Sequence, residues 1–148
     1  MKYVVLCLLI FSFTQFSSAD ATLESRVKIL PENQLSLQAG TITYSFQLQD
    51  TVEGKLLTDV DLNESHTKKI HFIAYDSALK EFSHVHPTFN GSVWSAALNL
   101  PVSGNYFLWA QGELLDGTEF SVSTRTSVIN GLPQNPILPL IDIRTGTD

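Results

Sequence analysis

The chain has only one cysteine, Cys7, and one methionine, Met1, and both lie at its N-terminal end. A disulfide framework is therefore excluded, and a domain further along the chain must be stabilised by a hydrophobic core. The same shortage excludes a blue-copper centre, which needs a cysteine thiolate, as well as thiolate or thioether sites for Cu(I). A metal site would have to use histidine, carboxylate or backbone oxygen ligands.

Positive charge is also scarce, since nine lysine and arginine residues are set against fifteen aspartate and glutamate residues, with a formal net charge of −6. Proteins bind phosphate backbones through basic side chains, so this balance argues against a nucleic-acid partner and against an anionic membrane surface. The sequence also lacks a G-x-S-x-G nucleophile elbow and a glycine-rich phosphate loop. We therefore expect that the protein is not an enzyme.

The one long apolar run, residues 4–13 (VVLCLLIFSF), is too short for a comfortable membrane span. Lys2 precedes it, and the small residues 17–19 (SSA) follow it, which is the pattern of a secretory signal peptide. We predict a signal peptide at residues 1–19, so that the exported protein begins at Asp20, is periplasmic or secreted, and has no membrane span after cleavage. An uncleaved anchor is the alternative.

The rest of the sequence alternates between short β-like runs and turn signals. Residues 41–48 (TITYSFQL) show the clearest alternation of apolar and polar side chains, and Asn90-Gly91 and Asp116-Gly117 are typical hairpin turns. No helical period is present. Further runs are expected at 25–30, 35–38, 69–75, 82–86, 93–100, 105–112 and 118–129. This spacing predicts an all-β, immunoglobulin-like antiparallel β-sandwich of about seven strands, spanning residues 20–130.

The last segment, residues 131–148, differs in composition because Pro133, Pro136 and Pro139 lie close together. We predict an extended C-terminal tail whose apolar residues pack on the sandwich or on a partner. Those apolar residues are Ile137, Leu138, Leu140 and Ile141.

Three of the four histidines fall within residues 69–87 (KIHFIAYDSALKEFSHVHP). His84 and His86 are two residues apart, so on an extended strand their side chains leave the same face. If Tyr75 pairs with Phe82 in a hairpin, His71 lies opposite His86 and the three imidazoles share that face. A shift of one residue would move His71 to the opposite face. The sequence alone leaves both registers open.

We predict that His71, His84 and His86 bind a transition metal, copper(II) first and zinc second, because imidazole suits both ions and copper(II) is generally bound more tightly. The alternative is that His84 and His86 are solvent-facing residues on an edge strand and that His71 is a half-buried polar residue. His66, in a polar loop, is a possible fourth ligand, although the sequence favours a solvated loop residue. Four acidic neighbours could complete the coordination shell: Asp61, Glu64, Asp76 and Glu81.

The same segment resembles bacterial exported β-sandwich proteins related to the YtkA-like family. The likeness runs over roughly residues 54–111, and its most specific part is F-x-H-x-H-P, at residues 82–87. The later stretch PVSGNYFLWAQ, at residues 101–111, also matches. The resemblance implies copper-related metal handling through His71, His84 and His86, with a membrane or envelope metal-handling protein as partner. The rival hypothesis is a non-metal interaction module that docks an envelope partner through the apolar tail.

Overall fold

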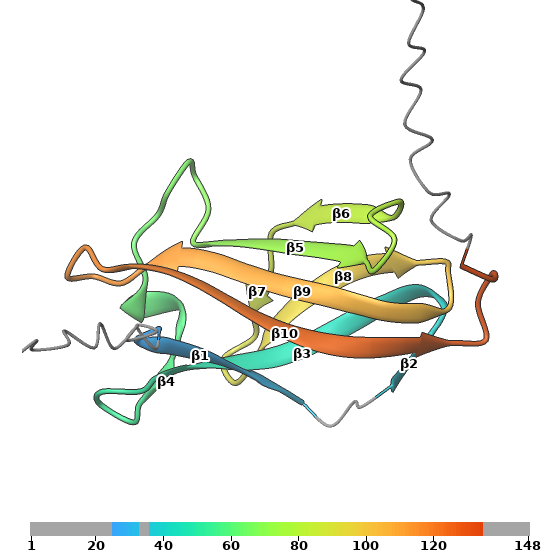
Figure 1. Ribbon diagram of the computed structural model, residues 1–148. Helices are drawn as coiled ribbons and strands as arrows, with labels where there is room; N and C mark the ends of the chain where they lie inside the picture. Colours follow the sequence, from blue (N-terminus) through green and yellow to red (C-terminus); the bar gives the residue numbers. More distant parts are fainter. Residues whose placement is uncertain (1–24, 33–35, 135–148) are drawn as a thin grey trace, which may run out of the picture.

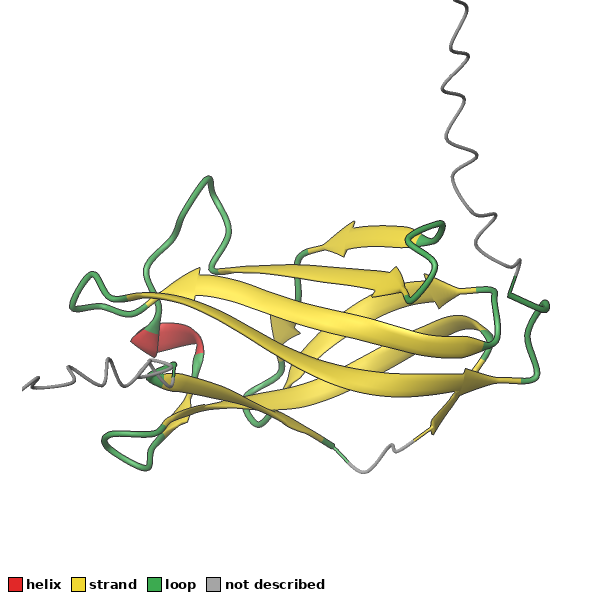
Figure 2. Ribbon diagram, in the orientation of Figure 1, coloured by secondary structure: helices red, strands yellow, loops and turns green. Residues whose placement is uncertain are grey.

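The computed structural model describes residues 25–32 and 36–134, which form two packed β-sheets (Figure 1 and Figure 2). The predicted signal peptide and most of the predicted tail lie outside the described residues, so the division at residues 19 and 130 stays a prediction. The strands are β1 Val27–Pro31, β2 Ser36–Gln38, β3 Gly40–Asp50, β4 Leu56–Leu57, β5 Ile70–Asp76, β6 Phe82–Val85, β7 Thr88–Phe89, β8 Trp94–Leu100, β9 Gly104–Glu113 and β10 Glu119–Ile129. A short 3-10 helix, η1 Asp59–Asp61, precedes β5.

The strand order is that of an immunoglobulin-like sandwich. One sheet has the order β1-β3-β8-β7, with β4 on β3, and the other has the order β2-β10-β9-β5-β6. All pairs are antiparallel except β2 with β10. This division corresponds to the A-B-E-D sheet and the G-F-C sheet of immunoglobulin domains, the latter extended by one strand at each edge, β2 and β6. The predicted fold class is therefore confirmed.

The predicted strands lie where the alternating runs indicated, but the described residues contain ten strands instead of about seven. The strands that the sequence did not indicate are β4 and β7, with two residues each, whereas β2, expected at residues 35–38, has three. A strand of two residues is too short to show an alternation of side chains in the sequence. Its pairing is fixed by the neighbouring strands. Both predicted turns are confirmed, with Gly91 and Gly117 at φ of 96° and 85°, where glycine is favoured.

The core lies between the sheets and is built from alternate residues of each strand. On β3, Tyr44, Phe46 and Leu48 are at most 1% exposed, and the rings of Tyr44 and Phe46 lie against Phe72 on β5 of the other sheet. The rings of Phe46 and Phe72 stack at 4.9 Å. Burying one such side chain contributes about 1.5–3 kcal/mol. Because β5 buries Ile70, Phe72 and Ala74, the residues between them point outward.

The start of the predicted tail is bonded to the sandwich. The amide of Leu132 donates to the carbonyl of Pro101, and the amide of Ser103 donates to the carbonyl of Leu132. The side chain of Gln134 donates to the carboxylate of Asp76 at 3.0 Å. The chain thus remains attached to the domain up to residue 134, next to the end of β5.

Candidate metal site

The β5–β6 hairpin determines where the histidines lie. Tyr75 pairs with Phe82 and Ile73 pairs with His84, so the register that would bring the histidines together is confirmed. His71 is on β5 and His84 is on β6, the edge strand of its sheet (Figure 1). His86 follows β6 directly, where the chain leaves for β7 in the other sheet.

A buried carboxylate stabilises the turn of this hairpin. Asp76, at the end of β5, is 1% exposed and accepts hydrogen bonds from the amides of Lys80 and Glu81 at 2.7 and 2.9 Å. Burial alone would raise the pKa of Asp76, but these bonds and the one from Gln134 outweigh it, and the pKa falls below its ordinary value. Asp76 therefore remains an ionised turn cap, which helps to fix the hairpin register.

The three imidazoles form a compact triangle. Their ring centroids lie 5.3 Å apart for His71 and His84, 4.9 Å for His71 and His86, and 5.1 Å for His84 and His86. One nitrogen from each ring lies within 4.8 Å of the other two. His71 is half-buried, whereas His84 and His86 are exposed, so the group is open to an ion from solvent.

The closest contact in this group has the spacing of two ligands on one ion. The Nδ1 atom of His71 lies 3.1 Å from the Nε2 atom of His84. If both nitrogens were about 2.0–2.1 Å from one metal, that separation would correspond to an N–metal–N angle of about 100°. This angle lies between the square-planar and tetrahedral values, so little movement of His71 and His84 is needed for binding. In this structure a hydrogen bond joins the two nitrogens, one of which donates and the other accepts.

The surroundings of His86 favour its neutral imidazole, which is the form that binds metal. Partial loss of solvation lowers the pKa of His86, and positive charge on His71, His84 and Lys68 lowers it further. Because a metal competes with protons for the same lone pairs, a lowered pKa extends binding to lower pH.

His66 and the acidic neighbours lie outside the donor group. The ring centroid of His66 is 6.5 Å from that of His71, and among the described residues only His71, His84 and His86 meet the spacing for a shared ion. Asp61 instead pairs with Lys55 and accepts hydrogen bonds from Thr58. Asp76 caps the hairpin turn, as described above.

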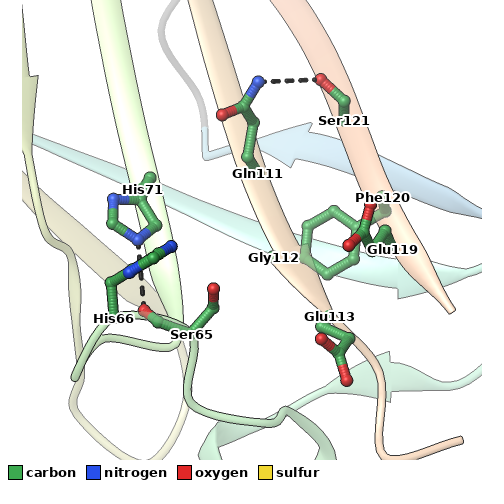
Figure 3. Close-up of a pocket in the computed structure, with 9 residues that line it drawn as sticks. All are labelled: Ser65, His66, His71, Gln111, Gly112, Glu113, Glu119, Phe120 and Ser121. Carbon is green, nitrogen blue, oxygen red and sulfur yellow. Dashed lines mark hydrogen bonds between the residues drawn. The ribbon is translucent and has the colours of Figure 1, made fainter. Parts of the chain in front are cut away.

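A groove of about 560 Å³ adjoins the site on the outer face of the sheet. Figure 3 shows His66 and His71 on one side of it, with Gln111 and Ser121 across from them. His71 pairs with Gln111 on β9, which pairs with Ser121 on β10, so the groove crosses three strands. Sequence reasoning missed these residues because only the sheet order brings them beside the histidines. The full lining is Ser65, His66, His71, Gln111, Gly112, Glu113, Glu119, Phe120 and Ser121.

The fold and the site together define an immunoglobulin-like β-sandwich with a histidine triad at a sheet edge. No protein-family model matches the chain, and no curated protein matches it. Among solved structures, the Lin-41 filamin domain is similar, with 16% identity over 72% of this chain and 94% of that chain, at a TM-score of 0.43. CopC from Methylosinus trichosporium OB3b is also similar, with 9% identity over 75% of this chain and 100% of that chain, at a TM-score of 0.45.

Membrane-spanning helices were also sought in the described ranges, 25–32 and 36–134. No helix there is long and apolar enough to cross a membrane.

Proposed function

We propose that the protein binds a divalent transition metal through His71, His84 and His86 and that it handles this metal outside the cytoplasm without catalysing a reaction. The observation that carries the proposal is the convergence of three imidazoles from β5, β6 and the residue directly after β6, with one nitrogen of each within 4.8 Å of the others. Each of the three rings thereby offers one donor nitrogen to a common ion.

Copper(II) is the proposed metal and zinc is the second candidate. Imidazole nitrogen is a good ligand for both ions, and the general affinity order places copper(II) above zinc. A site of three neutral histidines leaves at least one coordination position for water or for a ligand from another molecule. The donors are also at an exposed sheet edge, where a partner protein can reach the ion, and this favours delivery or transfer of the metal.

The proposed setting rests on two features of the sequence. The N-terminal segment has the pattern of a signal peptide, which supports a periplasmic or secreted location and an envelope protein as the metal partner. The resemblance of the F-x-H-x-H-P segment at residues 82–87 to YtkA-like proteins supports a copper-related role. Both features concern the sequence alone.

Calorimetric titration of copper(II) and zinc into the exported protein tests the proposal. Wild type should bind one ion per chain, and His84→Ala or His86→Ala should weaken binding at least about 100-fold, since loss of an outer contact alone costs 10–100-fold. Lys80→Ala is a control on the same hairpin, at an exposed cation away from the donors, and it should bind as wild type does. Absence of binding by wild type, or unchanged affinity in both histidine variants, would contradict the proposal.

An interaction module without metal is the second candidate. It is favoured by the exposure of Phe82, which is 70% exposed on β6 beside the site, and of Leu79, which is 76% exposed in the hairpin turn. In that case the titrations would show no metal binding, and the same edge would serve as a contact surface for an envelope partner.

A further inference from the structure

The loop before β5 contains a tight turn of an uncommon kind. Ser65 and Lys68 exchange two backbone hydrogen bonds, of 2.8 and 3.1 Å, across the two central residues His66 and Thr67. Both central residues have positive φ, 51° and 69°, as in a type I′ turn. Such turns favour Asn-Gly, and positive φ is unfavourable for a β-branched residue such as Thr67. The surrounding structure therefore maintains this turn against local preference.

The turn places a backbone carbonyl against the histidine triad. The carbonyl oxygen of Ser65 lies 3.3 Å from the Nε2 atom of His71 (Figure 3). The same oxygen accepts the amide hydrogen of Lys68, so a single turn bond and a single side-chain bond use its two lone pairs. A carbonyl oxygen can only accept a hydrogen bond, so the Nε2 atom of His71 must be the donor.

The position of this hydrogen decides which nitrogen of His71 faces the site. In a neutral imidazole with hydrogen on Nε2, the lone pair is on Nδ1. That Nδ1 atom is the one 3.1 Å from the Nε2 atom of His84, inside the triangle of rings. Histidine ligands of metals commonly donate their second nitrogen to a carbonyl or carboxylate, which fixes the tautomer and orients the ring.

We propose that the Ser65–Lys68 turn is the positioning element of the metal site, and that it directs Nδ1 of His71 to the metal beside Nε2 of His84. This inference rests on the proposed metal-binding function. Thr67 acts as a positioning residue, because its left-handed backbone keeps the Ser65 carbonyl against His71 while its own side chain is not a ligand.

Two variants at one position separate the turn from the ligands. Thr67→Gly retains the turn, since glycine adopts positive φ without strain. Thr67→Pro removes it, because proline fixes φ near −65° and disfavours the present conformation of His66 as well. Neither variant alters a donor side chain, and circular dichroism of each establishes that the sandwich is intact.

The experiment combines zinc calorimetry with long-range ¹H–¹⁵N NMR of the histidine rings at about pH 8, where imidazoles are neutral. In metal-free wild type and Thr67→Gly, His71 should carry its hydrogen on Nε2, and added zinc should shift the resonance of Nδ1. Thr67→Pro should lose this single tautomer and bind zinc about 10–100-fold more weakly, while Thr67→Gly binds as wild type does.

The outcomes distinguish this inference from the function on which it rests. If zinc binds through Nε2 of His71, or if Thr67→Pro binds as tightly as wild type, the positioning role is wrong while the metal site stands. If wild type binds no zinc and no copper(II), the proposed function and this inference are both wrong. Should Thr67→Pro not fold, the ring spectra of wild type and Thr67→Gly still decide which nitrogen binds zinc.

Discussion

Two clusters of ionisable side chains in this molecule differ in how their charges are balanced. In the first, Arg26 donates hydrogen bonds to Asp50 and Asp116, so that the residue directly before β1 is joined to β3 and to the β9–β10 turn. In the second, the rings of His71, His84 and His86 face one another, and in the described residues none of them forms an ion pair with a carboxylate.

The difference is visible in the pKa directions. Hydrogen bonds from Arg26 lower the pKa of Asp50, and those from Thr118 and Arg26 lower that of Asp116 to about 2. Each of these shifts favours the ionised form that is present in the fold. In the histidine cluster, partial loss of solvation and repulsion by positive charge on His71 and His84 favour the neutral form of His86. The cluster at Arg26 is completed by folding, whereas the histidine cluster has no partner of opposite charge among the described residues, and we propose that a metal ion fills that role.

The largest effect that this comparison predicts is at His84, where metal binding should be lost without a loss of fold stability. His84→Ala should weaken copper(II) binding at least about 100-fold and leave the thermal midpoint of the metal-free protein nearly unchanged, because an exposed edge residue contributes little to the core. Calorimetry and thermal denaturation of the same preparation measure both quantities. A large loss of metal-free stability in His84→Ala would show that the histidine cluster is structural.

A pH titration should resolve the two clusters as separate events. Metal binding should weaken as the pH falls below about 6.5, because protons then compete for the imidazoles. The lowered pKa of His86 means that the unfolded chain binds its proton more readily, so metal-free stability also begins to decline in this range.

The carboxylates around Arg26 should respond at lower pH. The pKa of Asp116 is about 2 in the fold and about 3.9 in the unfolded chain, so its stabilising contribution is complete above about pH 4 and is lost as the pH falls towards 2. Metal release and acid unfolding should therefore be two transitions when followed by calorimetry and circular dichroism. A single transition near pH 6 for both would contradict the comparison.

Removal of the cation from the first cluster should have the converse effect. Arg26→Met leaves Asp50, 2% exposed, without its ion-pair partner, and this should lower the thermal midpoint by several degrees while metal affinity is retained. Lys28→Met, at an exposed cation two residues further on, on β1, is the matched control and should be neutral. Equal midpoints for the two variants would show that the pairing with Arg26 contributes nothing measurable.

The smallest effect is expected at His66. His66→Asn preserves the type I′ turn, which favours asparagine at that position, and removes an imidazole that lies outside the donor group. Loss of an orienting contact lowers metal affinity roughly 10–100-fold. The change in metal affinity of His66→Asn should be smaller than this. A loss as large as that of His84→Ala would make His66 a fourth ligand, and calorimetry of the two variants side by side decides the point.

The sheets were predictable because their signal is local. Residues 41–48 alternate so regularly that β3 is evident from the sequence, and Asp116-Gly117 marks the turn between β9 and β10. The parallel pairing of β2 with β10 was not predictable, since these strands are distant in the chain and β2 has only three residues. The two-residue strands β4 and β7 likewise depend on neighbours that the sequence does not reveal.

The site was predictable in its residues and only conditionally in its geometry. The H-x-H spacing placed His84 and His86 on one face, but the position of His71 depended on a hairpin register that Asp76 helps to fix through backbone hydrogen bonds. The contact between His71 and the carbonyl of Ser65 had no sequence signal. It uses a backbone atom, and the turn that presents it has His-Thr where Asn-Gly is typical.

Diffraction from crystals of the zinc-loaded protein, with anomalous data at the zinc edge, tests the central claim most directly. We predict one strong peak per chain between β5 and β6, with nitrogens of His71, His84 and His86 at about 2.0–2.1 Å from the ion. A zinc peak at another location, or the absence of a zinc peak at the three imidazoles in crystals grown from excess zinc, would contradict the metal site.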